Sequence, residues 1–188
     1  MKFPGPLDDG AAALGWMVEE AASLGIDPAR IAVGGDSAGG NLAAALAIRA
    51  KGRVRFQLLI YPVTDASWDT ASYREFASGF GLTRANMAWF WESYLSKPAD
   101  AEDPLVSPLR AKDLSGLAPA FVATAECDVL RDEGEAFAKR LHEAGVRVRC
   151  VRYRNLNHGF ARMGAVYPQA DRALSDMAAA LREGLGGP

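Results

Sequence analysis

Hydrophobic positions along the chain fall into two patterns, helical stripes and short uninterrupted runs. Between residues 10 and 24, Leu14, Met17, Val18 and Ala21 recur at the spacing that places side chains on one face of a helix. Short apolar runs bounded by glycine or proline are typical of buried strands. The full pattern predicts helices over residues 10–24, 38–50, 131–144 and 168–183, and strands over residues 30–35, 54–61, 120–125 and 146–153.

The order of these elements predicts an α/β fold. Strand 30–35, helix 38–50 and strand 54–61 form a strand–helix–strand unit, whose two strands must lie parallel. Between residues 63 and 119 the pattern loosens, and one clear helix follows Thr83. That helix presents on one side the apolar residues Met87, Phe90, Trp91, Tyr94 and Leu95. We therefore expect a single domain with a mainly parallel sheet of about four strands, flanking helices, and a small insertion over residues 63–119.

Composition narrows the possible partners. The 188 residues include 21 basic and 23 acidic side chains, for a net charge of −2. This balance argues against nucleic-acid binding, which needs a concentrated basic surface. The one basic cluster comprises Arg147, Arg149, Arg152 and Arg154, which we interpret as the solvated face of a strand. The longest uncharged stretches, residues 37–48 and 114–125, are 12 residues long, fewer than the roughly 18 that a membrane helix needs.

Cysteine and histidine are scarce. Cys127 and Cys150 do not make a disulfide framework, and we interpret both as free, buried thiols in a reducing cytoplasm. Asp8 and Asp9 precede the first apolar run, whereas a secretory signal carries basic residues there. Two distant histidines and two cysteines offer no metal-ligand spacing. We expect neither a metal nor another cofactor.

A candidate nucleophile lies between the first predicted strand and the helix that follows it. Gly35, Asp36, Ser37, Ala38 and Gly39 form a G-x-S-x-G motif in the strand–turn–helix context that a nucleophilic serine requires. A sharp turn at the serine calls for glycine two positions before and after it. The amide of Ala38 is then the natural first donor to an oxyanion. Alternatively, Ser37 is an ordinary helix N-cap with glycine neighbours.

A serine hydroxyl needs a base, and the chain has two histidines. His142 lies in the last turn of a predicted helix, where histidine commonly interacts with free carbonyls. His158 lies in a polar loop after the fourth predicted strand and is the better base. The imidazole in turn needs an orienting carboxylate. Glu126, Asp128 and Asp132 all follow the third strand, and spacing alone leaves the three open, although Asp132 also suits a helix first turn.

Loops that follow parallel strands emerge at one edge of the sheet. Ser37, the acidic cluster after residue 125 and His158 therefore share a rim. With Asp128 as the acid, the order is serine, aspartate, histidine, which is the order found in α/β hydrolases.

Four stretches carry a family resemblance. GDSAGGNLA at 35–43, YPVTD at 61–65, DVLRDEG at 128–134 and HGF at 158–160 resemble the bacterial branch of the hormone-sensitive lipase family of carboxylesterases. The resemblance implies an α/β-hydrolase fold that hydrolyses small, uncharged, short-acyl esters through an acyl-enzyme. It also implies a nucleophile, an orienting carboxylate and a general base, which are Ser37, Asp128 and His158. A peptidase or lactonase on the same scaffold stays open, because a triad does not encode the leaving group.

The same resemblance predicts the substrate contacts. Part of the insertion would form a cap over an acyl pocket, although a helix that buries its own aromatic face explains the same residues. We take Asp36, Trp91 and Phe160 as candidate substrate-binding residues, whereas Trp89 points off the apolar stripe.

The chain departs from the family at its start. Members carry further strands and a histidine- and glycine-rich oxyanion loop upstream of the helix that begins here near Asp8. We therefore expect a truncated α/β-hydrolase fold with weak activity, because loss of one oxyanion donor costs about 10²- to 10³-fold in turnover. Strand 30–35 would lack a neighbour, and an unpaired strand favours a homodimer. The alternative function is a catalytically silent dimeric binding or scaffold protein.

Overall fold

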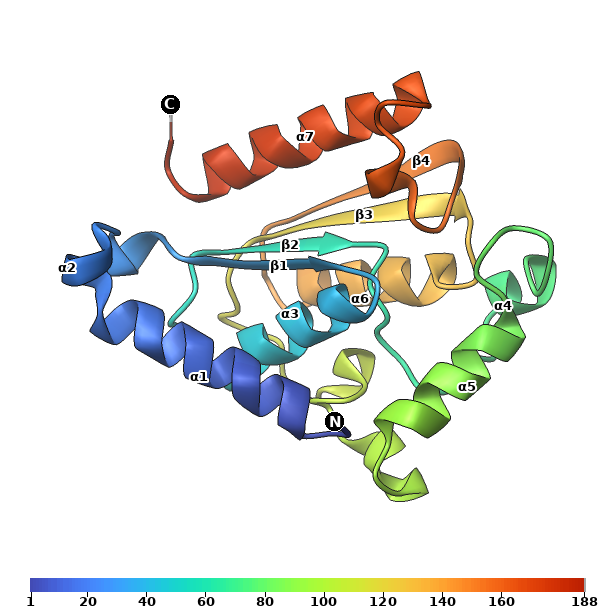
Figure 1. Cartoon of the computed structure of the whole chain (residues 1–188), viewed down its shortest axis with the longest axis horizontal. Coiled ribbons are helices and arrows are strands. Elements are labelled where there is room, and N and C mark those ends of the chain that lie inside the picture. Colours follow the sequence, from blue (N-terminus) through green and yellow to red (C-terminus); the bar gives the residue numbers. More distant parts are fainter. Residues whose placement is uncertain (188) are drawn as a thin grey trace.

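A computed structural model describes residues 1–187, which contain a four-stranded parallel sheet. The strands are β1 (Ala32–Asp36), β2 (Phe56–Ile60), β3 (Ala120–Cys127) and β4 (Val148–Asn157), and they lie side by side in chain order. Their carboxyl ends all point to the right in Figure 1. This arrangement confirms the predicted α/β class and its four parallel strands.

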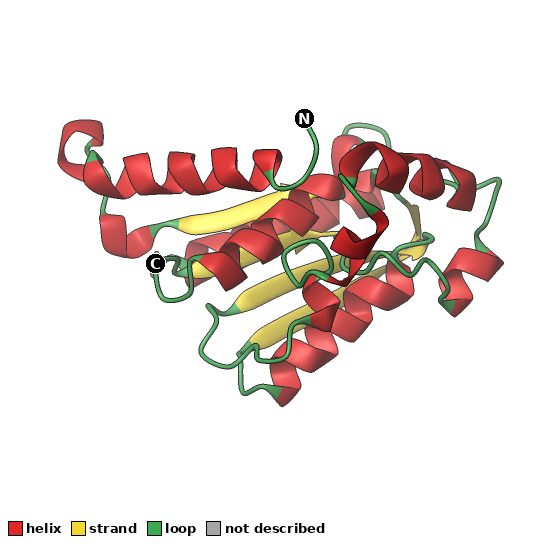
Figure 2. Ribbon diagram, turned by 90° about the horizontal axis from the view of Figure 1, so that it is seen from below, coloured by secondary structure: helices red, strands yellow, loops and turns green. Residues whose placement is uncertain are grey.

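Helices cover both faces of the sheet (Figures 1 and 2). One face carries α1 (Gly5–Glu19), α3 (Ala38–Arg49) and α6 (Arg131–Glu143), and the other carries α7 (Pro168–Gly184). Ala43, Ala44, Ala45 and Ala47 of α3 are almost completely buried, so this helix packs closely against the sheet with small side chains. Two apolar cores result. The first joins α1, α3 and α6 to the sheet, and the second joins α7 to Phe56 and Phe121.

Several predicted boundaries are wrong. The first helix begins at Gly5 rather than residue 10, and a break at Glu20 separates α1 from the short α2 (Ala21–Leu24). Proline near its start explains the early beginning, since proline fits the first helical turn. The structure extends β3 to Cys127 and β4 to Asn157, past the polar residues at which the hydrophobic pattern stops.

The first part of the predicted insertion over residues 63–119 lies beyond the carboxyl ends of the strands (Figure 1), whereas Ala111, Leu114 and Leu117 near its end pack in the first core. Its main helix is α5 (Arg84–Tyr94), which begins as predicted after Thr83. Thr83 and Asn86 exchange the two hydrogen bonds of a capping box. The pattern missed α4 (Ala71–Glu75) and two 3₁₀ turns. Buried side chains of α4 and α5 form a third core with Val129 and Leu130, so this insertion packs against the rim of the sheet.

Both cysteines are free, but the prediction that they are buried is wrong. Cys150 is exposed because β4 is an edge strand of the described sheet, and Cys127 is half-buried. Within residues 1–187, no helix is both long and apolar enough to cross a membrane.

Candidate active site

Ser37 lies in a strained turn between β1 and α3. Its φ of 57° and ψ of −118° are in a region that residues with a side chain rarely adopt. Two backbone hydrogen bonds tie the turn to the end of β2 and the residues after it, from the Ser37 amide to the Ile60 carbonyl (2.9 Å) and from the Val63 amide to the Ser37 carbonyl (3.3 Å). Surrounding structure therefore imposes the strained conformation, which is common at functional sites.

The glycines around Ser37 have different roles. A Cβ on Gly35 would overlap the backbone of Gly39, so the expected need for glycine before the serine is confirmed. A Cβ on Gly39 would meet nothing within 4 Å, and the expected need for glycine there is wrong. The crowded position is instead Gly40, where a Cβ would lie 2.9 Å from the Cβ of Pro62.

His158 follows β4 and lies between the serine and a carboxylate. Its Nε2 atom is 2.9 Å from Ser37 Oγ, and its Nδ1 atom is 2.7 Å from Asp128 Oδ2. The side chain of Asp128 is fully buried, and that of His158 is 13% exposed. The amide of Leu130 donates to the other carboxylate oxygen of Asp128 (3.0 Å), which fixes the orientation of the carboxylate. In this arrangement His158 can take the proton of the Ser37 hydroxyl, while Asp128 orients the imidazole and stabilises its charge.

The other candidates lie elsewhere. Glu126 accepts a hydrogen bond from the Asn155 amide (2.8 Å). Asp132, in the first turn of α6, accepts one from the Ser72 amide (2.7 Å). His142 is exposed in the last turn of α6. Of the three acids that spacing left open, only Asp128 contacts His158.

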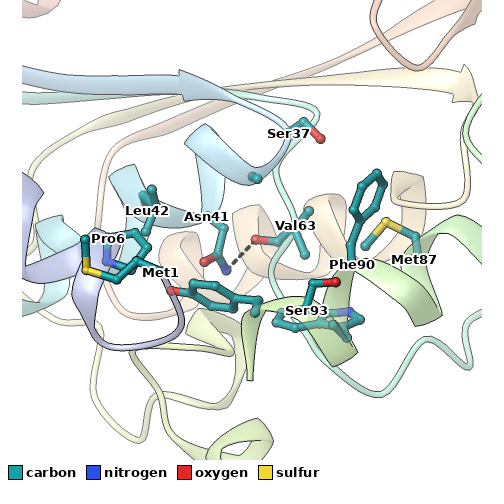
Figure 3. A pocket seen from close by; sticks show the side chains of 12 residues that line it. Met1, Pro6, Ser37, Asn41, Leu42, Val63, Met87, Phe90 and Ser93 are labelled. Atoms are coloured by element: carbon teal, nitrogen blue, oxygen red, sulfur yellow. Dashed lines mark hydrogen bonds between the residues drawn. The ribbon is translucent and has the colours of Figure 1, made fainter. Parts of the chain in front are cut away.

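A cavity of about 400 Å³ opens beside Ser37 (Figure 3). In Figure 3, Phe90 rises from α5 toward Ser37, and Met87 lies beside it. Asn41 on α3 lines the cavity and donates to the carbonyls of Val63 (3.0 Å) and Val106 (2.8 Å), which joins α3 to the insertion. The cavity is mostly apolar, so it suits an uncharged ligand of modest size.

The three predicted substrate contacts differ in outcome. Trp91 lines the cavity, although its side chain is also largely buried in the core of the insertion. Phe160 does not line it, because its ring is fully buried between Tyr61 and Tyr153. Asp36 also lies outside the cavity lining, and its carboxylate accepts a hydrogen bond from the Tyr61 hydroxyl. Neither Phe160 nor Asp36 therefore lines this cavity, and their role in substrate binding stays a prediction.

Ala38 is the first residue of α3 and lines the cavity. The first amides of a helix have no partner within the helix, and the helix dipole favours negative charge beside them. Its N–H is thus suited to bind an oxyanion formed at Ser37. Within the described residues, no three His, Cys, Asp or Glu side chains are grouped to hold a metal ion.

The loop after β2 is held by a buried carboxylate. Glu133 on α6 is 1% exposed, and its Oε1 atom accepts hydrogen bonds from the amides of Thr64 (2.6 Å) and Asp65 (3.2 Å). Burial raises the pKa of Glu133 from 4.5 to about 8. The folded chain therefore binds a proton at this site that the unfolded chain releases above about pH 4.5.

We expect this proton to make stability fall as pH rises from about 4.5 to about 8, since the folded state binds more protons than the unfolded state in this window. Glu133→Gln keeps an oxygen for the two amides and removes the titration. The free energy of unfolding is measured with urea at pH 5 and at pH 8.5. The difference between these two values should be smaller in the variant than in the wild type, by on the order of 3 kcal/mol. Equal pH dependence in both chains would contradict this assignment.

Comparison with known proteins gives the family. A sequence profile of the alpha/beta hydrolase fold matches residues 1–162. The chain belongs to the alpha/beta hydrolase family. It is 42% identical over 189 residues to an ethyl acetate hydrolase of Pseudomonas putida and 41% identical to the carboxylic ester hydrolase LipN of Mycobacterium tuberculosis. The matches cover 98% and 95% of this chain, and 59% and 50% of those proteins.

Solved structures agree with this assignment. A thermostable esterase from Pseudomonas putida superimposes with a TM-score of 0.95 at 43% identity, and the metagenomic carboxylesterase EstE1 with 0.94 at 44%. Each match covers 98% of this chain, and 60% and 65% of those structures. The expected α/β-hydrolase fold is therefore confirmed, and this chain spans about three fifths of the curated relative from Pseudomonas putida.

Proposed function

We propose that this hydrolase cleaves carboxylic esters through an acyl-enzyme, as the resemblance to the hormone-sensitive lipase family implies. The single observation that carries the proposal is the hydrogen-bond chain from Ser37 Oγ through His158 to Asp128. The esterase names of relatives that are more than 40% identical support the same reaction class.

In the first half of the proposed reaction, Ser37 Oγ attacks the ester carbonyl while His158 Nε2 takes the hydroxyl proton. Asp128 stabilises the imidazolium, and the Ala38 amide stabilises the oxyanion. The imidazolium then gives its proton to the leaving alcohol as the carbon–oxygen bond breaks. In the second half, water attacks the acyl-enzyme and gives a proton to His158. The imidazolium then gives this proton to Ser37 Oγ as the acyl–oxygen bond breaks, which releases the acid and regenerates the Ser37 hydroxyl.

We propose small, uncharged esters with short acyl chains as substrates. The cavity beside Ser37 has room for a small ligand and is lined by apolar side chains such as Leu42, Val63 and Phe90. An acyl chain removed from water in this cavity gains about 0.8 kcal/mol for each buried methylene. A relative named for ethyl acetate hydrolysis also acts on a small ester.

The test is covalent labelling of the 188-residue chain. An organophosphate should modify one serine per chain, and peptide mass spectrometry should locate the adduct at Ser37. A p-nitrophenyl acetate burst should release up to one equivalent of nitrophenol. Ser37→Ala should show neither. If Ser37 takes no label and both chains hydrolyse the ester at the same background rate, the esterase proposal fails and the silent binding protein is supported.

We also propose a homodimer, because β1 is an edge strand of the described sheet and its outer side has unpaired backbone groups. Size-exclusion chromatography with light scattering should give twice the mass of the chain, and Ala32→Lys on this strand should shift the population to monomer. A monodisperse wild-type monomer would contradict the dimer.

The two free cysteines support our proposal of a reducing, cytoplasmic location.

A further inference from the structure

Tyr61 lies between the segments that carry Ser37 and Asp128, but it has no role in the proposed reaction. It directly follows β2, the strand between the one that precedes Ser37 and the one that leads to Asp128. The side chain is 1% exposed, and φ is 35°, a value that a non-glycine residue rarely adopts. Its amide donates to the Ala123 carbonyl (2.6 Å). Such a conformation persists only where the surrounding structure imposes it.

The Tyr61 ring supports the imidazole of His158. The two ring centroids are 4.6 Å apart, with planes inclined at 56°, and on another side the Tyr61 ring meets Phe160 at 5.1 Å. The hydrogen bonds of His158 to Ser37 and Asp128 use its two ring nitrogens, so both bonds lie near the plane of the imidazole. They restrain tilting of the ring about the line between the nitrogens only weakly. A packed ring outside that plane restrains this tilt.

The Tyr61 hydroxyl is anchored beside the nucleophile. It donates to Asp36 Oδ2 (3.3 Å), and Asp36 directly precedes Ser37. Arg162, in the 3₁₀ turn Phe160–Arg162 after His158, donates to the same oxygen (3.1 Å), but its side chain is 80% exposed, so this ion pair contributes little by itself. Burial and the Asp36 carboxylate raise the pKa of Tyr61, so its hydroxyl stays protonated and remains a donor.

We propose that Tyr61 is a positioning residue that sets the tilt of the His158 imidazole between Ser37 and Asp128, with its hydroxyl held by Asp36. This inference rests on the proposed esterase function. Tyr61 is not among the residues that line the cavity, so it acts on the base and not on the substrate. Its loss should therefore lower kcat and leave KM almost unchanged, because small misplacements of reacting groups are costly in rate.

The test compares Tyr61→Leu and Tyr61→Phe with the control Tyr153→Leu. Tyr153 packs against the other side of Phe160 (5.4 Å) in the same core, and its hydroxyl binds Asp176 rather than a residue of the site. Tyr61→Leu should lower kcat for p-nitrophenyl butyrate by about 30-fold. Tyr61→Phe keeps the ring but loses the anchor, and should lower kcat about threefold. Tyr153→Leu should lower the melting temperature but leave kcat within twofold.

A second measurement does not depend on turnover. The proton between His158 Nδ1 and Asp128 should give a downfield NMR resonance, which His142, the other histidine of the chain, cannot give because it is exposed. This resonance should be sharp in the wild type and in Tyr153→Leu, broader in Tyr61→Phe and absent in Tyr61→Leu. The resonance also tests the positioning role of Tyr61 separately from the esterase function, since a chain without Ser37-dependent hydrolysis can still show the resonance and its dependence on Tyr61.

Two results would overturn the inference. One is a kcat loss in Tyr61→Leu no larger than in Tyr153→Leu, and the other is a rise in KM that accounts for the whole loss. Should Tyr61→Leu fail to fold, Tyr61→Met serves in its place, because it also removes the ring, and an unchanged kcat together with an unchanged resonance would show that the Tyr61 ring does not position His158.

Discussion

Replacement of either Ser37 or His158 by alanine is expected to lower kcat for p-nitrophenyl esters by about 10⁴- to 10⁶-fold, and replacement of both to cost no more than either alone. The 2.9 Å contact between His158 Nε2 and Ser37 Oγ is the reason. A base without its nucleophile has no proton to take, and a serine without its base is a weak nucleophile. The two side chains therefore act as a unit.

The measurement is steady-state hydrolysis by the two single variants and the double variant, each checked for folding by circular dichroism. His142→Ala is the matched control, since this histidine is exposed in the last turn of α6, at the end of the helix away from Asp128. It should keep kcat within twofold. Additive losses in the double variant would show that Ser37 and His158 do not work together.

The sequence predicted the parts of the site that topology determines. Parallel strands bring their carboxyl ends to one rim, and Ser37 and His158 follow strands that the hydrophobic pattern located within a few residues. Spacing could not choose among Glu126, Asp128 and Asp132, because all three closely follow the predicted strand 120–125. The structure distinguishes them by partner, since each carboxylate binds a different group.

What the sequence could not predict depends on packing between distant segments. Phe160 lies two residues after His158 and is a candidate substrate contact from the sequence, but its ring packs in the core beside Tyr61. Asp36 precedes the nucleophile, yet it binds Tyr61 and Arg162. Neither position has a signal in hydrophobic periodicity. The YPVTD stretch at 61–65 was the one clue to Tyr61, and it marked a resemblance without giving the contact with His158.

The aromatic residues of the insertion show why a helical stripe is ambiguous. Met87 and Trp91 on α5 are buried in the core of the insertion, and both also line the cavity. Phe90 lines the cavity but is 46% exposed, and Trp89 is 62% exposed. In the sequence, core packing and pocket lining are alternative explanations of these residues, but a single helix face supplies both because the cavity lies between α3 and α5.

Asp128→Asn is expected to lower kcat about 10⁴-fold with little change in the position of His158. The Leu130 amide donates to one oxygen of Asp128 (3.0 Å), so an asparagine would turn its carbonyl oxygen to that amide and its NH₂ group to His158. The NH₂ group would then donate to Nδ1, which places the imidazole proton on Nε2. A protonated Nε2 cannot accept the proton of Ser37, and the base is lost although its hydrogen bonds remain.

The neighbouring acids provide the controls for this prediction. Asp132→Asn and Glu126→Gln remove carboxylates that bind the amides of Ser72 and Asn155, so both variants should lose stability but keep kcat within about twofold. The measurements are kcat with p-nitrophenyl butyrate and the melting temperature of each chain. A loss of less than tenfold in Asp128→Asn, or a loss of similar size in either control, would mean that a different carboxylate orients His158.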